Sequence, residues 1–254
     1  MAGRYFHGPF LRAAGFEVVG ATTTNPERIG HLKEDFPNAI AYENVSKVLH
    51  NLNEDIAVYA SDVRSLDEIQ GIGESIAKKI IEYFENKSTP IKISLIVCNV
   101  PGAGVLEIAK SKGIPTLLIN KTEFATTGYV ESLHNADIHF IVLAGFLWKV
   151  PAVLVKAFQP SSNTKGIINI HPALLPKYGG KGMYGAHVHE AVIAAGEAES
   201  GITIHWVNEH YDEGAIIFQA TCKIENGDTP DMLANKIHAL EHAHFAPTIE
   251  KLLS

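Results

Sequence analysis

The feature that most constrains the fold is an apolar run at residues 166–176 (GIINIHPALLP), which carries two polar residues, Asn169 and His171. An apolar run of this length, bounded by Gly and Pro, is typical of a strand buried in a parallel sheet. Residues two apart in a strand share a face, so Asn169 and His171 should project together. Pro172 ends the strand at the carboxyl edge, where open α/β sheets bind ligands. The alternative is a satisfied core histidine beside a structural asparagine.

Strand-like and helix-like segments alternate regularly along the chain. Strands are expected at residues 54–61, 93–98, 115–119, 140–144, 166–171, 201–207 and 215–224. Helices are expected at residues 102–112, 130–135, 152–158, 186–195 and 230–244, the last capped by Thr229. Strand–helix–strand repetition favours right-handed crossovers between parallel strands. The pattern therefore predicts an α/β fold, a Rossmann-like and mostly parallel sheet with helices on both faces.

Composition narrows the class of protein further. The chain has 254 residues, of which 46% are hydrophobic and 19% charged, enough for a large core. Its net charge of −7 argues against sequence-independent nucleic-acid binding as the main activity. Cys98 and Cys222 lie in strand-like runs and are expected to be reduced core thiols. No apolar run reaches membrane-spanning length and the N-terminus lacks a signal-peptide layout, so a cytoplasmic protein is expected.

Residues 1–54 are predicted to form a partial α/β extension, with strands at residues 16–22 and 39–42 and helices that begin after Asn25 and Asn44. Residues 55–254 are predicted to form the main domain. The extension resembles the dinucleotide-binding half of oxidoreductases related to glucose-fructose oxidoreductase, at residues 3–10, 15–20 and 25–28. That family's first strand and Gly-rich loop would lie before Met1. Without the loop there is no amide cradle for a pyrophosphate, so an added sheet edge or packing layer is expected instead of a dinucleotide site.

Residues 66–84 contain Gly71 and Gly73 ahead of a helical pattern that begins at Ser75. The segment resembles a helix-hairpin-helix element, whose hairpin amides can contact nucleic-acid phosphates. Acidic residues crowd this hairpin, so a structural turn before a packed helix is the favoured interpretation. A nucleic-acid-binding module on this segment stays open as an alternative, and its affinity for DNA would fall steeply with salt.

A more extensive resemblance is carried by five segments together. They are residues 142–146 (VLAGF), 169–178 (NIHPALLPKY), 201–205 (GITIH), 212–219 (DEGAIIFQ) and 241–242 (EH). Over about residues 93–254 the chain is similar to the glycinamide ribonucleotide formyltransferases, folate-dependent enzymes of purine synthesis. The resemblance implies a formyltransferase-like fold and transfer of a formyl group from N10-formyltetrahydrofolate to a ribonucleotide amine. It implies small-molecule substrates, no membrane partner, and a monomer or homodimer.

By this resemblance the catalytic set is Asn169, His171 and Asp212. Acyl transfer favours these residue types, because the oxyanion of its intermediate needs preorganised hydrogen-bond donors. The Asn169 amide donates without titrating. His171 donates best as imidazolium, a form that a neighbouring carboxylate favours. Asp212 can supply that charge and accept the amine's proton, directly or through water. The alternative for Asp212 is a solvated turn residue.

The resemblance also implies two groups of binding residues. Backbone groups of Leu147, Trp148, Lys149 and Val150 would hold the pterin ring of the folate, with Asn208, Glu209 and His210 as the second wall. The ribonucleotide would be bound by Gly71, Gly73, Ser75, Pro172 and Glu241. Gly71 and Gly73 would present amides to the phosphate at a helix start.

The residues expected to bind the substrate phosphate depart from the family pattern. Residues 57–61 resemble the strand that leads into the family's Gly-rich phosphate loop, but residues 62–70 intervene before any Gly-x-Gly appears. Glu74 would then repel a phosphate, and Lys78 and Lys79 would offset this repulsion in part. A catalytically impaired folate-binding or scaffold protein, in a chimeric chain with a disrupted phosphate loop, is therefore kept as an alternative function.

The histidine-rich sequence raises the question of a metal. His187, His189 and His205 include a His-x-His step, which is a possible ligand pair. No Cys or carboxylate follows at comparably tight spacing, so no metal is expected.

Overall fold

The computed structural model describes residues 20–22, 34, 40–42, 56–60, 72–87, 89, 91–160 and 166–253. The chain divides into two compact units. One comprises Met1–Asn53 and Gly128–Asp137, and the other comprises Glu54–Thr127 and Ile138–Ser254. The sequence-based domain boundary between residues 54 and 55 stays a prediction.

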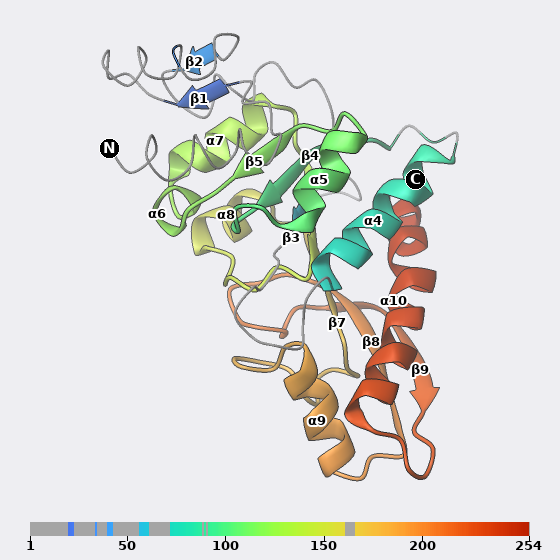
Figure 1. Ribbon diagram of the computed structural model, residues 1–254. Coiled ribbons are helices and arrows are strands. Elements are labelled where there is room, and N and C mark those ends of the chain that lie inside the picture. Colours follow the sequence, from blue (N-terminus) through green and yellow to red (C-terminus); the bar gives the residue numbers. More distant parts are fainter. Residues whose placement is uncertain are drawn as a thin grey trace. The chain divides into compact units, whose positions relative to one another are not determined.

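The first unit contains a short parallel pair of strands, β1 (Gly20–Thr22) and β2 (Ile40–Tyr42), drawn in blue in Figure 1. Most of the helix α7 (Thr127–Asn135) also belongs to this unit. Both strands fall within segments where the sequence predicts them. The helices predicted after Asn25 and Asn44 lie outside the described residues, apart from Glu34, which is helical.

The second unit is built on a seven-stranded sheet with the order β5-β4-β3-β6-β7-β8-β9 (Figure 1). Its strands are β3 (Ile56–Ala60), β4 (Ile93–Cys98), β5 (Thr116–Leu118), β6 (Phe140–Ala144), β7 (Gly166–His171), β8 (Glu199–Trp206) and β9 (Ile216–Lys223). The first five are mutually parallel, and β8 and β9 add an antiparallel edge. The expected Rossmann-like, mostly parallel α/β sheet is confirmed.

The helices of this unit are α4 (Ile72–Glu85), α5 (Gly104–Ser111), α6 (Lys121–Phe124), α8 (Ala152–Ala157), α9 (Ala186–Ala194) and α10 (Pro230–Leu253). α4 packs on β3 and β6 and against α5, whereas α10 packs on β8 and β9 and against α4 and α9. The apolar spacing of α4 explains its place, because Ile76, Ala77, Ile80 and Ile81 share one face and are buried. These contacts close a continuous core between the helices and the sheet.

The strand order reverses direction at β3, and this reversal, a topological switch point, positions the site. From β3 the chain moves outward through β4 to β5, and it then returns to add β6 and β7 on the other side of β3. Loops that leave neighbouring strands on opposite sides of such a point open a crevice at the carboxyl edge. The segments that follow β6 and β7 meet there.

Two helices differ from the sequence-based expectation. α10 continues to Leu253, so the predicted end near His244 is wrong. Pro247 removes one helical N–H, but Phe245, Ala246 and Ile249 are buried around it, and this packing outweighs the lost bond. α6 was not predicted, although Asn120 caps it by accepting from the N–H groups of Thr122 and Glu123. The predicted Thr229 cap is confirmed, since its hydroxyl accepts from the N–H of Met232 at 3.2 Å.

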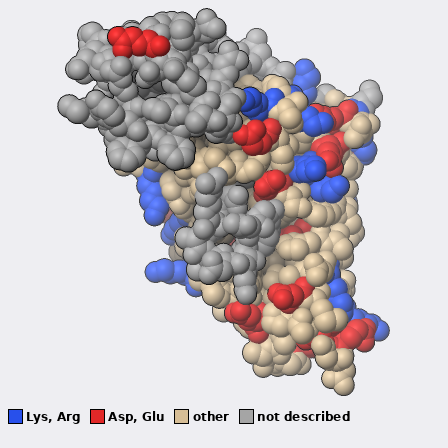
Figure 2. Space-filling model, viewed as in Figure 1, with Lys and Arg blue, Asp and Glu red and all other residues tan. Residues whose placement is uncertain are grey.

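The surface around α4, α5 and the carboxyl end of α10 carries both signs of charge, and Figure 2 shows blue and red side chains next to each other there. Ion pairs join Lys112 to Glu85 and Lys87 to Glu250. Lys79, predicted to offset Glu74, pairs with Glu82 at 3.0 Å. The visible charges are thus interspersed rather than gathered into a basic stripe. Within the described part of the chain, no helix is long and apolar enough to cross a membrane.

Candidate active site

A cavity of about 410 Å³ lies at the switch point of the second unit. Its walls come from the residues after β6, the end of β7, the glycine-rich loop 180–185, the residues after β8, and the helices α4, α9 and α10. Polar groups gather at the end of β7, and apolar and aromatic side chains line much of the remainder. An apolar pocket with a few convergent polar groups is the usual form of a small-molecule site.

Asn169 and His171 both line this cavity, as the alternation of the strand predicts. His171 is only 3% exposed. Its Nε2–H donates to the carbonyl oxygen of Tyr178 at 2.8 Å, because a carbonyl can only accept. That bond fixes the orientation of the ring and leaves Nδ1 directed toward Asp212. Tyr178 itself has a φ of 57°, which turns the loop back over the strand.

His205 completes the polar group from the next strand. The antiparallel register of β7 and β8 sets His205 directly opposite Asn169. Its Nδ1–H donates to the carbonyl oxygen of Trp206 at 3.0 Å, so in the neutral ring Nε2 is an acceptor. The Asn169 amide donates to this Nε2 at 3.3 Å. His205 therefore orients the Asn169 amide, a role that the sequence analysis missed when it considered this residue only as a metal ligand.

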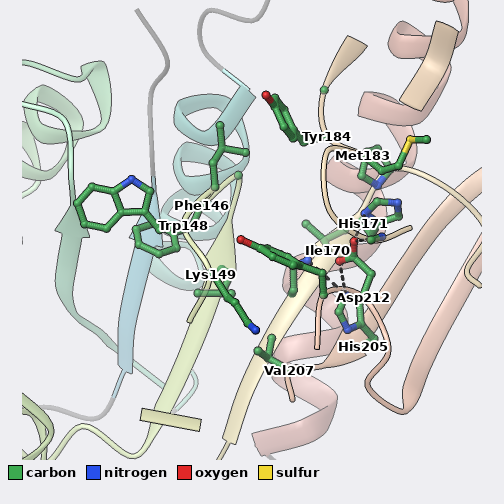
Figure 3. Close-up of a pocket in the computed structure, with 18 of the residues that line it drawn as sticks. Phe146, Trp148, Lys149, Ile170, His171, Met183, Tyr184, His205, Val207 and Asp212 are labelled. Atoms are coloured by element: carbon green, nitrogen blue, oxygen red, sulfur yellow. Dashed lines mark hydrogen bonds and ion pairs between the residues drawn. The ribbon is translucent and has the colours of Figure 1, made fainter. Parts of the chain in front are cut away.

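Asp212 joins the two histidines from the loop after β8, and Figure 3 shows the three side chains pointing toward one another. Its Oδ2 lies 3.6 Å from Nδ1 of His171, and its Oδ1 lies 3.6 Å from Nε2 of His205. The N–H of Gly180 donates to Oδ2 at 2.9 Å. The Gly180 N–H thus fixes the carboxylate beside both rings, and the Asp212 side chain is only 11% exposed, so the interpretation of Asp212 as a solvated turn residue is wrong.

The nearby carboxylate favours the charged form of His171, as expected, but it does not alone decide the protonation of this group. Burial lowers the pKa of His171 below its ordinary value, and the attraction of Asp212 offsets this only in part. Burial alone would raise the pKa of Asp212, but His205, the charge of His171 and the Gly180 N–H together lower it. At neutral pH the site therefore holds a carboxylate beside a neutral His171, whose unprotonated Nδ1 can accept a proton.

The residues after β6 form a second wall with apolar and aromatic character. Leu147, Trp148, Lys149 and Val150 all line the cavity. Trp148 packs against Phe146, with ring centroids 6.1 Å apart, and the Lys149 ammonium lies 5.8 Å from the centroid of the Tyr211 ring. Phe146, Trp148 and Lys149 lie across the cavity from His171 in Figure 3. This arrangement suits a flat aromatic ligand that reaches toward the polar group.

Only some of the residues after β8 that were predicted to form the opposite wall line the cavity. Asn208 and His210 line the cavity, and the Asn208 side chain accepts from the N–H of His210 at 2.8 Å. Glu209 is not among the lining residues. It is half exposed, and its carboxylate lies 3.7 Å from the ammonium of Lys156. Of the three residues predicted for this wall, the structure therefore brings two into the cavity.

The residues predicted to bind the ribonucleotide are also partly assembled. Gly73, Pro172 and Glu241 line the cavity. The Ser75 hydroxyl does not reach it and instead bonds Nε2 of His242 at 2.9 Å. Gly71 lies outside the described residues. The sequence analysis missed Met183 and Tyr184 of the glycine-rich loop, and His189 and His238, which also line the cavity; a glycine cluster next to a histidine-rich helix was the available signal.

The Glu74 carboxylate does not lie in the cavity, where it was expected to repel the substrate phosphate. A Cβ added to Gly104 would meet the Glu74 carboxylate at 2.0 Å, so this carboxylate lies against the amino end of α5. Negative charge is favoured at that end of a helix. Glu74 is also absent from the residues that line the cavity. The carboxylate thus has a structural partner, and Gly104 leaves the space that it needs.

No three His, Cys, Asp or Glu residues in the described ranges are grouped so as to hold a metal ion. His187 lies 3.6 Å from Glu190 on the exposed side of α9. His189 faces the other way and is buried. Cys98 and Cys222 are both reduced thiols, and Cys98 is buried whereas Cys222 is only partly buried.

His189 should make the fold sensitive to acid. Burial lowers its pKa from the ordinary 6.5 to about 4, helped by the charges of His238 and His171. Between pH 6.5 and pH 4 His189 is protonated in the unfolded chain but not in the folded chain. Its contribution to the free energy of unfolding is therefore fully present above pH 6.5 and falls toward pH 4. The expected contribution of this residue to the loss between pH 7 and pH 5 is about 2 kcal/mol.

Urea unfolding at pH 7 and pH 5 checks this expectation. The loss of unfolding free energy should be about 2 kcal/mol smaller in His189→Leu than in the parent protein. His187→Leu, the same change at an exposed position of the same helix, should keep the parent's loss. Equal losses in all three proteins would show that His189 is not the group that titrates.

Comparisons with known proteins identify the class. The model of a family described as "Formyl transferase" matches residues 69–249. This chain therefore belongs to the formyl transferase family. The match includes α4, so the segment compared above with a helix-hairpin-helix element is part of the formyl transferase region; the hairpin itself lies outside the described residues. Residues 1–54 lie outside the match.

The relatives narrow the family to the phosphoribosylglycinamide formyltransferases. The chain is 39% identical over 183 residues to the chloroplastic phosphoribosylglycinamide formyltransferase of Arabidopsis thaliana, covering 70% of this chain and 61% of the relative. It is 32% identical over 180 residues to the Bacillus subtilis enzyme of that name, covering 68% and 87%. The crystal structure of the Bacillus halodurans enzyme superposes with a TM-score of 0.66 at 32% identity, covering 79% and 96%. The chain spans about three fifths of the length of the two first plant relatives.

Proposed function

We propose that this protein transfers the formyl group of N10-formyltetrahydrofolate to the amine of glycinamide ribonucleotide, a step of purine synthesis. The observation that carries the proposal is the meeting of Asn169, His171 and Asp212 at one end of the cavity, held by His205 and by the loop after β7. When an amine attacks a formyl carbon, the reaction requires an amide donor, an imidazole and a carboxylate.

The reaction begins with the substrate ammonium. It gives one proton to the His171–Asp212 pair, whose free Nδ1 faces the carboxylate at 3.6 Å. The amine then attacks the formyl carbon and forms a C–N bond, which leaves a negative charge on the formyl oxygen. The new imidazolium and the Asn169 amide donate to this oxyanion. Proton uptake at Nδ1 of His171 thus supplies a donor that the neutral ring does not offer at that atom.

The intermediate collapses when a second proton moves. The attacking nitrogen carries it, Asp212 accepts it directly or through water, and it is delivered to N10 of the folate as the C–N10 bond breaks. The products are the formylated amide and tetrahydrofolate, and one proton is released overall. Asn169, His171 and Asp212 are therefore proposed as the catalytic residues.

The folate is proposed to lie along the wall formed by residues 147–150, with Asn208 and His210 opposite. Main-chain groups there would bond the pterin, and Val150 and Val207 would contact its faces. Glu209 has no part in this proposal, because its carboxylate is turned to Lys156. The ribonucleotide is proposed to lie on the side of Gly73, Pro172 and Glu241, with the amino end of α4 nearest its phosphate. The predicted cytoplasmic location stays a proposal, and plant relatives are described as chloroplastic.

A formyl-transfer assay with the purified full chain tests the proposal. Glycinamide ribonucleotide and N10-formyltetrahydrofolate are mixed with the enzyme, and release of tetrahydrofolate and formation of the formylated ribonucleotide are followed together. Both products should appear in equal amounts and only when both substrates are present. Binding of folate in a calorimeter without turnover would overturn the proposal in favour of a catalytically impaired folate-binding protein.

A further inference from the structure

The loop after β7 carries two main-chain groups that hold the proposed catalytic side chains. The carbonyl oxygen of Tyr178 accepts from the Nε2–H of His171 at 2.8 Å. The N–H of Gly180 donates to the carboxylate of Asp212 at 2.9 Å. The short segment 178–180 therefore orients both His171 and Asp212. Its position matters to the chemistry, because a shift of about 1 Å in a reacting group can cost on the order of a hundredfold in rate.

The backbone of this segment is strained at Tyr178. Its φ of 57° lies in the left-handed region, which residues other than Gly rarely adopt. Such a conformation is unfavourable by itself and persists only where surrounding contacts impose it. The contacts that keep the segment in place must therefore act on Tyr178 or its neighbours.

The first part of the loop is held from inside the fold. The Thr203 hydroxyl donates to the carbonyl oxygen of Ala173 at 2.7 Å and accepts from the N–H of Leu175 at 3.0 Å. The Gln219 amide donates to the carbonyl oxygen of Leu175 at 3.1 Å. These bonds fasten residues 173–175 to β8 and β9, and they do not reach the segment that orients the catalytic side chains.

That segment is held from outside the cavity by Glu197. One oxygen of its carboxylate accepts from the Tyr178 hydroxyl at 2.9 Å and from the Lys177 ammonium at 2.8 Å. The bonds from Lys177 and Tyr178 lower the pKa of the Glu197 carboxyl, whereas burial and the bond to Glu197 raise the pKa of the Tyr178 hydroxyl. At neutral pH a carboxylate therefore accepts from a protonated phenol. Tyr178 is thus bonded at both ends, by its side chain to Glu197 and by its carbonyl oxygen to His171.

Glu197 can serve as an anchor because the end of α9 fixes its own position. Gly196 follows the helix with a φ of 66°, and its N–H donates to the carbonyl oxygen of Ile193 at 3.0 Å. β8 begins at Glu199, only two residues after Glu197. The anchor therefore lies between the end of a helix and the start of a strand of the main sheet.

We propose that Glu197 is a positioning residue for formyl transfer, which acts through Tyr178. Its bond to the phenol holds the segment that orients His171 and Asp212. This inference rests on the proposed function, since it takes these two residues as catalytic. Neither Glu197 nor Tyr178 lines the cavity. Loss of the bond between them should therefore reduce kcat without weakening the binding of either substrate.

Kinetics of variants of the full-length enzyme test the inference. Glu197→Ala and Tyr178→Phe each remove one side of the bond, and each should lower kcat about tenfold while the KM for both substrates changes less than about twofold. The double variant should lose no more than either single variant. Glu197→Gln keeps an oxygen that can accept from the phenol, so it should recover most of the rate. Melting temperatures should stay near the parent's, because a single bond near the surface adds little to stability.

Two controls separate this bond from the charge around it. Lys177→Met removes the other partner of the carboxylate, whose side chain is 67% exposed. Glu199→Gln changes an exposed acidic residue close by in the chain. Both should keep the parent's kcat. In a His171→Ala background, Glu197→Ala should lower the remaining rate less than about threefold, because one of the two side chains that it positions is gone.

Unchanged kcat in both Glu197→Ala and Tyr178→Phe, with an active parent enzyme, would overturn the inference. Additive losses in the double variant would also overturn it, since they would show that the two residues act separately. A large rise of both KM values would do the same, because it would indicate a distorted cavity. Absence of turnover by the parent enzyme would instead refute the proposed function, and this inference with it.

Discussion

Replacing Asp212 by Asn is expected to lower kcat/KM for formyl transfer on the order of 10⁴-fold. The carboxylate accepts the proton that leaves the attacking amine, and an amide cannot. It also lies 3.6 Å from both His171 and His205, so its charge helps His171 to become the imidazolium that binds the oxyanion. Asn keeps the shape of Asp and tolerates the backbone φ of 57° found at this position. The substitution therefore tests charge and proton transfer with little change in structure.

Steady-state kinetics with both substrates measure the effect, and calorimetry with each substrate shows whether the cavity is intact. Glu213→Gln is the matched control, because Glu213 is the adjacent acidic residue, is exposed and does not line the cavity. It should keep the parent's rate. A rate for Asp212→Asn above about a tenth of the parent's would contradict the role given to this carboxylate, since loss of a general base costs at least about a hundredfold.

Replacing His171 by Ala is expected to lower kcat by about a hundredfold to a thousandfold, the usual cost of losing one oxyanion donor. The KM for each substrate should change far less, because the imidazole bonds the oxyanion more strongly than the ground-state formyl oxygen. Added imidazole should restore part of the rate, since the substitution leaves a ring-sized space beside Asp212. Asn169, whose amide remains, accounts for the activity that is left.

The control for this variant is His139→Ala, which removes an exposed histidine outside the cavity. It should behave as the parent enzyme, with or without imidazole. If His171→Ala and the parent had equal, non-zero rates, the assignment of the catalytic group would be wrong. A parallel loss of folate binding would show instead that His171 mainly shapes the cavity.

Local sequence rules were sufficient for the parts of the site that lie within one strand. Asn169 and His171 could be paired because alternation along β7 depends only on the strand geometry, and Pro172 marks its end. The partner of Asn169 could not be found in this way. His205 lies 36 residues further on, and only the antiparallel register of β7 and β8 brings it opposite. Register is a property of two strands together, and the sequence of either strand alone leaves it open.

The protonation of the site was also beyond local rules. The sequence places a carboxylate near His171 and so favours imidazolium, but the sign of the pKa shift depends on how deeply the ring is buried. Burial proved the larger effect for His171. The same limit applies to Glu74, which seemed to oppose a phosphate until the structure placed it against Gly104 of a different helix. Both corrections concern contacts between segments distant in the chain.

The division of β7 and β8 into two faces has a practical consequence. Thr203, which bonds the main chain of Ala173 and Leu175, continues the polar face of Asn169, His171 and His205. Ile168, Ile202 and Ile204 occupy alternate positions and are buried in the core, and the mostly buried Ile170 also lines the cavity. Chemistry and folding thus draw on different side chains of the same two strands. An inactive variant such as Asp212→Asn should still fold and hold both substrates unreacted, which would allow the complete ternary complex to be crystallised.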